Sequence, residues 1–266
     1  MRRNFHRILV WLGLSSICWI AGGVATHDAR FAWWALALSI ETIAPMAYFW
    51  VPGLGRSTIE DWDVEGAHLA ERCALFVIIA LGESLLVTGA TFAGLKWNVD
   101  ALLAFFVAVS GTILLWWIYF DTGARRATKR IEHASDPGRE ARSAYTYAHA
   151  VIVAGILACA VADEVVLLHP RHAEPLALGI VLGGPMLYLL GIALFKWITN
   201  DRRAPPLSHL AGLAMFGLLA WPTARGLLSP LHLSMLATGV LLVVAVWESL
   251  AIRRGIVPES LALDEE

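Results

Sequence analysis

Long apolar segments separated by short polar ones make up almost the whole chain. Eight of them approach the roughly 20 mainly apolar residues that a helix needs to cross a bilayer. Their approximate bounds are 5–26, 31–50, 68–91, 99–121, 144–168, 174–198, 207–228 and 231–252. A backbone exposed to lipid must satisfy its own hydrogen bonds, so each segment is predicted to be a helix rather than an open strand. The pattern predicts an all-α, polytopic transmembrane bundle of about eight helices.

The composition supports this class. The chain is 58% hydrophobic and 16% charged, whereas a soluble domain carries about 25% charged residues. The formal net charge of −2 gives no reason to expect a nucleic-acid partner. We predict one transmembrane domain over residues 1–258, followed by a short acidic tail over 259–266.

Basic residues set the predicted orientation. Most of the 20 Lys and Arg residues fall on one side of the predicted spans, which places both termini in the cytoplasm by the positive-inside rule. Arg2, Arg3 and the small residues near position 25 also resemble a secretory signal. The length of this first segment, together with Arg7 and Trp19 inside it, favours a spanning helix.

The segment 68–91 carries the most unusual polar residue. Glu83 lies inside an uninterrupted apolar run, where a carboxylate costs on the order of 2.5–3.5 kcal/mol by insertion scales. Helical spacing places His68, Arg72 and Glu83 on one stripe, and each needs a partner from another helix or water. His149 and Glu164 repeat the spacing of His68 and Glu83, which could reflect a duplicated hairpin or coincidence.

Glu41 lies near the middle of the second segment, four residues before Pro45. Proline has no N–H, so the Glu41 carbonyl loses its helical hydrogen bond and the helix is expected to bend. Two interpretations follow. The carboxylate and the freed carbonyl form a site for a proton, water or hard cation, or a neighbouring hydroxyl or indole satisfies the carboxyl.

Asp163 and Glu164 lie in the outer third of the fifth segment. We expect a structural ion pair with Arg225, which has a comparable depth. Glu248 is expected to reach the inner interface near Arg253 and Arg254.

The intramembrane acids outnumber the intramembrane cations. If the acids were all ionised, two would lack a cationic partner, which favours proton or cation handling over anion handling. The candidate residues of an ion or substrate path are Glu41, Glu83, Arg72, His68, Asp163 and Glu164.

No catalytic residue, metal site or cofactor is predicted. The chain lacks HExxH, GxSxG, P-loop and dinucleotide-binding patterns. The three cysteines, Cys18, Cys73 and Cys159, lie singly inside apolar runs and are interpreted as packing residues. Gly179 and Gly183 form a small-xxx-small pattern that predicts close helix packing.

One run of residues is similar to a known family signature. It extends from His68-Leu-Ala-Glu71-Arg72 to Leu81-Gly82-Glu83-Ser84, and it resembles the bacterial low-temperature-requirement A (LtrA) family. Two further segments support the resemblance: Trp116 to Asp121, and His149 through Asp163-Glu164 to Pro170. The resemblance implies a polytopic protein of the bacterial cytoplasmic membrane that is linked to growth in the cold, and it supplies no settled molecular activity.

Members of that family are typically longer, with upstream helices that carry a segment resembling Glu-Leu-Phe-Phe-Asp. This chain begins after that point, so we expect it to lack the family's N-terminal part. Those helices could complete the polar core.

Three functions are compatible with these observations. The first is a transporter that moves protons, cations or a small solute along buried carboxylates. The second is a membrane-embedded enzyme that modifies lipid, and the third is a sensor or scaffold in which polar groups only fix helix register. The expected partners are the lipid bilayer and a proton, cation or small solute, and an oligomer is compatible with the sequence.

Overall fold

The computed structural model describes residues 2–58, 66–121, 141–172, 174–199 and 204–253. Within these ranges the chain forms eight α-helices and one π-helix, and no β-sheet. The elements are α1 (Arg2–Val24), α2 (His27–Met46), α3 (Gly66–Ala93), α4 (Val99–Phe120), η2 (Ala141–Ala148), α7 (His149–Leu168), α8 (Pro175–Thr199), α9 (Leu207–Ala224) and α10 (Pro230–Arg253). The predicted all-α bundle of about eight helices is confirmed.

Seven helices of the described residues are long and apolar enough to cross a membrane. They are α1, α3, α4, α8, α9, α10 and the continuous helix formed by the end of η2 and α7. The other helix, α2, carries Asp28, Arg30 and Glu41 within its 20 residues. The protein is a multi-pass membrane protein.

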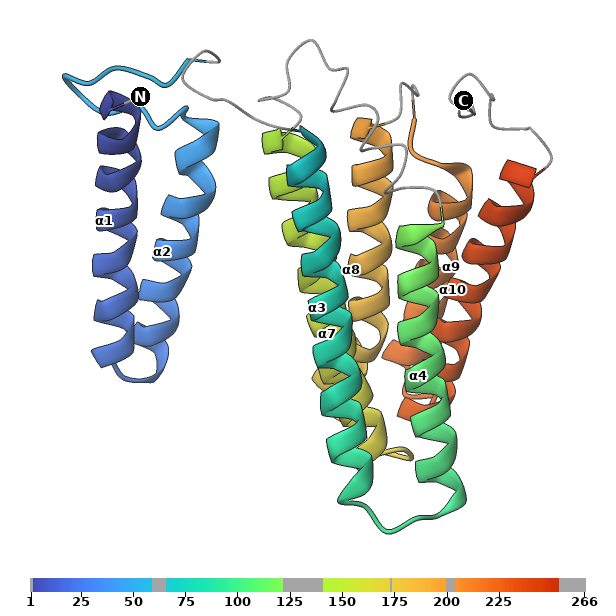
Figure 1. The fold of residues 1–266 in the computed structure, drawn as a ribbon. Helices are drawn as coiled ribbons and strands as arrows, with labels where there is room; N and C mark the ends of the chain where they lie inside the picture. Colours follow the sequence, from blue (N-terminus) through green and yellow to red (C-terminus); the bar gives the residue numbers. More distant parts are fainter. Residues whose placement is uncertain (1, 59–65, 122–140, 173, 200–203, 254–266) are drawn as a thin grey trace. The chain divides into compact units, whose positions relative to one another are not determined.

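The chain divides into two compact units, Met1–Val64 and Glu65–Glu266. In the first unit, α1 and α2 form an antiparallel hairpin (Figure 1). The buried Arg7 side chain of α1 donates from Nε, at 3.0 Å, to the backbone carbonyl of Leu54 in the turn after α2. Trp11 donates its indole N–H to the carbonyl of Trp50 at 3.1 Å. Polar side chains of α1 thus satisfy backbone groups that the turn leaves unpaired.

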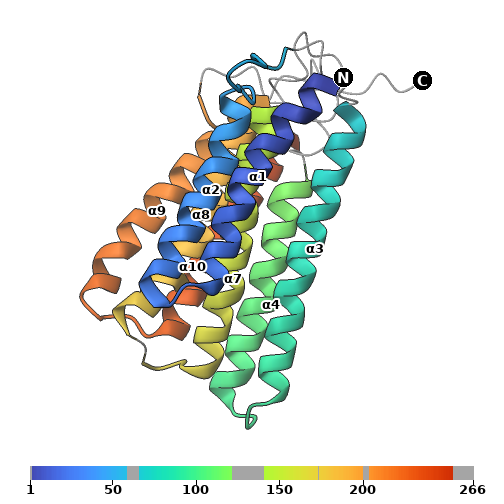
Figure 2. The same cartoon turned by 90° about the vertical axis from the view of Figure 1, so that its left-hand side faces the viewer.

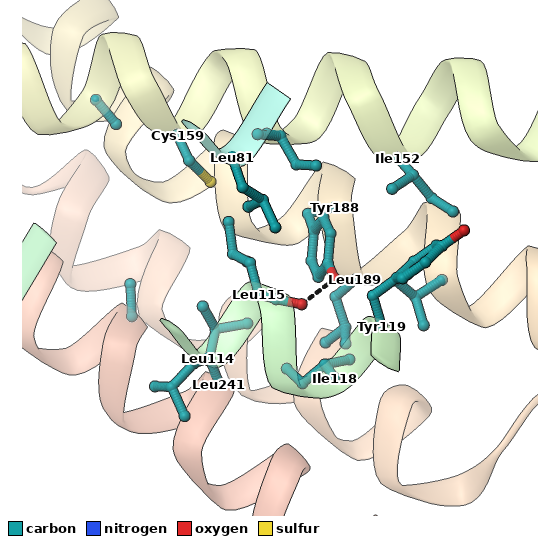
Figure 3. Packing of buried hydrophobic residues seen from close by; sticks show 14 of the residues in the cluster. Leu81, Leu114, Leu115, Ile118, Tyr119, Ile152, Cys159, Tyr188, Leu189 and Leu241 are labelled. Carbon is teal, nitrogen blue, oxygen red and sulfur yellow. Dashed lines mark hydrogen bonds between the residues drawn. The ribbon is translucent and has the colours of Figure 1, made fainter. Parts of the chain in front are cut away.

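In the second unit, α3, α4 and α7–α10 run along one another as a bundle (Figures 1 and 2). One cluster of buried apolar side chains connects these helices. Figure 3 shows part of it, in which the Tyr188 hydroxyl of α8 donates to the Leu115 carbonyl of α4 at 2.5 Å. A buried tyrosine usually finds such a partner because an unpaired hydroxyl in an apolar interior is costly.

The contact between α7 and α8 is extensive and depends on glycine. A Cβ on Gly191 of α8 would lie 2.8 Å from the Ile152 nitrogen of α7, and a Cβ on Gly155 would overlap the backbone of Tyr188. The predicted packing role of Gly179 and Gly183 is wrong, since a Cβ at either position would meet open space. The two glycines lie on a different face of α8 from Gly191, because the rotation of the helix decides which small residues meet α7.

An ion pair joins two segments at the opposite end of the bundle from the chain's predicted cytoplasmic loops. Arg171, after α7, donates from Nε to Asp100 in the first turn of α4 at 2.6 Å. This hydrogen bond raises the pKa of the Arg171 guanidinium. The single domain over 1–258 stays a prediction, and the 259–266 tail lies outside the described residues.

The glycine contact generates a stability prediction. Gly155→Ala should lower the free energy of unfolding by about 1–3 kcal/mol, because the added methyl group must push α7 away from α8. Gly183→Ala is the matched control and should have no destabilising effect, since its methyl group meets open space and alanine favours the helix. The measurement is denaturant unfolding in detergent micelles, followed by circular dichroism. Equal midpoints for the two variants would contradict the packing described here.

Candidate functional site

A buried ion pair lies between α8 and α10. Lys196 Nζ is 2.7 Å from both carboxylate oxygens of Glu248. It also donates to the Ile118 carbonyl of α4 at 3.1 Å. The Lys196 side chain is 2% exposed and that of Glu248 is 14% exposed, so the lysine is sealed inside the bundle while the carboxylate keeps limited access to its surroundings.

A histidine from a fourth helix completes this ionic cluster. His209 of α9 is fully buried, and its Nε2 atom lies 3.9 Å from Glu248 Oε2. Its other ring nitrogen, Nδ1, is 3.1 Å from the hydroxyl of Ser208, which is also buried. We call Lys196, Glu248, His209 and Ser208 the ionic cluster.

Helix ends bring the cluster together. Lys196 lies in the last turn of α8, and Ile118 lies in the last turn of α4. His209 lies in the first turn of α9, and Glu248 lies in the last third of α10. The last carbonyls of a helix have no partner within the helix, and a cation near that end is also favoured by the helix dipole. Lys196 satisfies both conditions at α4 while it holds Glu248.

An aromatic–histidine cluster lies beside the ionic cluster. Tyr119 is the neighbour of Ile118 in α4, and its hydroxyl lies 2.8 Å from His149 Nε2 in α7. In Figure 3 the Tyr119 hydroxyl points toward α7. His149 Nδ1 lies 2.9 Å from the Ala144 carbonyl. Because a carbonyl only accepts, Nδ1 carries the proton and Nε2 accepts from Tyr119.

The π-helix η2 positions this histidine. It ends at Ala148, directly before His149, and it contains Tyr145, whose ring stacks on the imidazole at a centroid distance of 5.5 Å. Phe195 meets the same imidazole edge-on at 4.8 Å. Phe195 directly precedes Lys196 in α8. Phe195 contacts the aromatic–histidine cluster, and Lys196 belongs to the ionic cluster. Short π-helical segments occur frequently at functional sites.

Among the described residues, no group of three or more His, Cys, Asp or Glu side chains is arranged to hold a metal ion. The ionic cluster supplies one carboxylate, and the neighbouring ammonium of Lys196 occupies both of its oxygens. The arrangement suits proton exchange and ion pairing rather than metal coordination.

Comparison with known proteins places the chain in a family. The model of the family described as bacterial low temperature requirement A protein (LtrA) matches residues 1–246. The chain belongs to the LtrA family. The resemblance carried by the sequence around Glu83 is thereby confirmed.

An uncharacterized protein, RA0937, of Rhizobium meliloti (strain 1021) is 39% identical to this LtrA family member over 252 residues. The matched region covers 94% of this chain and 60% of that protein, so the chain spans about three fifths of the length of its curated relative. No solved structure matches the chain.

Glu41 has partners inside the first unit of this LtrA protein. The hydroxyl of Ser15 and the indole N–H of Trp19, both on α1, donate to Glu41 Oε1 at 2.9 Å each. This is the second interpretation of Glu41, in which a hydroxyl and an indole satisfy the carboxyl.

The other predicted path residues are not brought together in the second unit. His68, Arg72 and Glu83 are exposed along α3, and Glu164 is exposed on α7. Asp163 is half-buried, and it makes no ion pair within the described part of the chain. The structure shows no pair with Arg225 among the described residues, and the Arg225 guanidinium lies over the Trp221 ring at 5.5 Å. The roles of these residues in a path stay predictions.

The ionic cluster was not predicted from the sequence. The sequence suggested Arg253 and Arg254 as neighbours of Glu248, whereas Glu248 pairs with Lys196. A usable signal was present. Lys196 directly precedes a tryptophan and Glu248 directly follows one, each within an apolar segment. Both residues lie near the C-terminal end of their predicted spans.

The ion pair of this LtrA protein generates a prediction for a double-mutant cycle. Lys196→Met should lower the free energy of unfolding by about 3–5 kcal/mol, because it leaves Glu248 buried without its cation. The double variant Lys196→Met/Glu248→Leu should recover most of that loss, since replacing both charges with apolar groups is often neutral. Denaturant unfolding in detergent measures both effects.

Lys96→Met is the matched control for this cycle, because Lys96 is exposed in the loop between α3 and α4. It should change the free energy of unfolding by less than about 0.5 kcal/mol. A double variant as unstable as Lys196→Met alone would contradict direct pairing of Lys196 with Glu248.

Proposed function

We propose that the protein transports a cation or small solute across the bacterial cytoplasmic membrane, and that the ionic cluster is the ionisable centre of its path. The observation that carries the proposal is the Lys196–Glu248 pair, enclosed by α4, α8, α9 and α10. Charged groups inside membrane helices are rare, and they mark ion pathways and proton relays.

The energetics support a functional origin for the pair. Removing two charges from water costs several kcal/mol per ion, and an apolar pair of similar volume is often equally stable. The spans of the second unit share the apolar core described above, so their cohesion does not need an ion pair. A pair retained under these conditions is well suited to a site in which one charge is neutralised or exchanged during a working cycle.

The exposure of the ionic cluster also supports entry of a proton or cation from the cytoplasmic side. Glu248 is 14% exposed while Lys196 and His209 are sealed. The helix ends that form the cluster border the predicted cytoplasmic loops, which carry most of the basic residues. A proton or cation that arrives from the cytoplasm therefore meets Glu248 before it meets the buried partners.

The two alternatives predict different behaviour. A lipid-modifying enzyme would change the lipid composition of the membrane when its gene is deleted, without any flux of its own. A sensor or scaffold would keep its function after the charges of Lys196 and Glu248 are exchanged with each other, because register depends on the pair and not on its direction.

The test is flux into proteoliposomes, followed with a pH-sensitive dye. Wild-type protein should move protons, alone or with an added cation, and Glu248→Gln should reduce the rate at least about tenfold, because the amide can neither ionise nor exchange a proton. The control is Glu174→Gln, which neutralises an exposed carboxylate just before α8 and should keep the wild-type rate.

Protein orientation and amount are measured in the same vesicles by protease protection. No flux from correctly inserted wild-type protein would overturn the proposal for this chain. Equal rates for wild type and Glu248→Gln would remove the ionic cluster from the path.

Glu83 is tested separately, since it is a predicted path residue on the exposed face of α3. If it belongs to the path, Glu83→Gln should abolish flux without preventing insertion, because a glutamine in an apolar run inserts more easily than a carboxylate. The same proteoliposome assay measures the effect. Unchanged flux would assign Glu83 to a contact surface instead.

A further inference from the structure

His209 has an unusual environment for a histidine inside a membrane protein. Its side chain is fully buried, and its Nε2 atom has no hydrogen-bond partner within the described residues. Buried polar atoms are nearly always hydrogen-bonded. The Glu248 carboxylate at 3.9 Å is too far for a hydrogen bond, but a displacement of about 1 Å would create one.

We infer that His209 is the proton-binding group of the ionic cluster, and that protonated His209 shares Glu248 with Lys196. This inference rests on the proposed function for its part in transport, and it names the proton as the coupling ion. Proton binding itself stands on the geometry and is tested without flux.

Ser208 makes the protonation chemically possible. The negative charge of Glu248 favours the tautomer with hydrogen on Nε2, so Nδ1 is the nitrogen that remains to take a proton. In this tautomer the Ser208 hydroxyl donates to Nδ1 at 3.1 Å. After Nδ1 binds a proton, the hydroxyl rotates and accepts from it, because a serine hydroxyl both donates and accepts. Neither state leaves Nδ1 unpaired.

Burial opposes a positive charge on His209, and two charged neighbours act on it in opposite directions. Helix α9 packs against α8 and α10. Of the described residues near the imidazole, α8 contributes the Lys196 ammonium and α10 contributes the Glu248 carboxylate. The Lys196 cation opposes protonation of His209, and the carboxylate favours it. Directly after α4, Asp121 accepts a hydrogen bond from Ser249 of α10 at 2.6 Å.

Proton binding would act on helix contacts. A protonated imidazole attracts Glu248 and competes with Lys196 for its oxygens. Lys196 also donates to the Ile118 carbonyl. Movement of Glu248 therefore changes the Lys196 contacts that join α8 to α10 and to α4. A proton that enters past the partly exposed Glu248 therefore alters the contacts among four helices, as coupling between a proton and a transported solute requires.

The test is histidine protonation measured by NMR with ¹⁵N-labelled histidine in lipid nanodiscs. The chain has nine histidines, and His209→Gln identifies the resonance of His209 by difference. We expect this resonance to become protonated as the pH falls toward 5, because the Glu248 anion at 3.9 Å offsets part of the cost of burying the charge. In Glu248→Gln the midpoint should fall by one pH unit or more, about tenfold in proton affinity, because the stabilising anion is gone.

Two further variants keep the test decisive. Ser208→Ala removes a hydrogen bond from both states of the imidazole, and it should lower the midpoint because the bond to the charged form is the stronger one. The variant carries little risk to folding. His232→Gln is the control, since His232 is exposed at the other end of α10 and bonds to Ser229. It should leave the His209 midpoint unchanged.

The outcomes separate this inference from the proposed function. A His209 resonance that stays neutral down to pH 5, or a midpoint indifferent to both Glu248→Gln and Ser208→Ala, overturns the inference, whether or not the protein shows flux. A titrating His209 that depends on Glu248 supports the proton site even if wild-type vesicles show no flux, which would overturn the transport proposal alone.

Discussion

The exclusion of water from the bilayer interior is the constraint on which this structure depends. A polar group inside the membrane must find a partner within the protein, since lipid offers none. The described helices satisfy this rule in several ways: Tyr188 donates to the Leu115 carbonyl, Tyr119 donates to His149, and Lys196 holds both Glu248 and the Ile118 carbonyl. These contacts cross between helices that are distant in sequence, and they fix how the bundle is arranged.

Two kinds of packing meet at the end of the bundle where the ionic cluster lies. Glycines let α7 and α8 approach closely along their length, which makes this pair a tightly packed wall. The end of α8 meets α4 and α10 through the Lys196 side chain instead. A tight apolar contact tolerates little change. The Lys196–Glu248 pair instead lies beside the His209 Nε2 atom, which has no hydrogen-bond partner among the described residues, so Glu248 can pair with either neighbour. Under the proposed function, the ionic cluster is the place where a charge change would be combined with a change in helix contacts.

The sequence predicted the fold more fully than the site. The apolar segments gave the helices with small errors at their ends, and the motif around Glu83 identified the LtrA family. The prediction for Glu41 left two interpretations, and Ser15 and Trp19 decided between them. The cluster of Lys196, Glu248 and His209 was missed, because each residue taken alone looks like an ordinary interfacial group at the end of a span.

Hydrophobicity is a property of a segment, so the sequence by itself determined that this chain crosses a membrane as helices and which family it belongs to. The partner of a buried charge is a property of how helices are rotated and placed. Lys196 and Glu248 are 52 residues apart, and one residue of helical rotation turns a side chain by about 100°. Only the tertiary structure could decide that these two face each other, that His209 faces both, and that Glu83 faces outward.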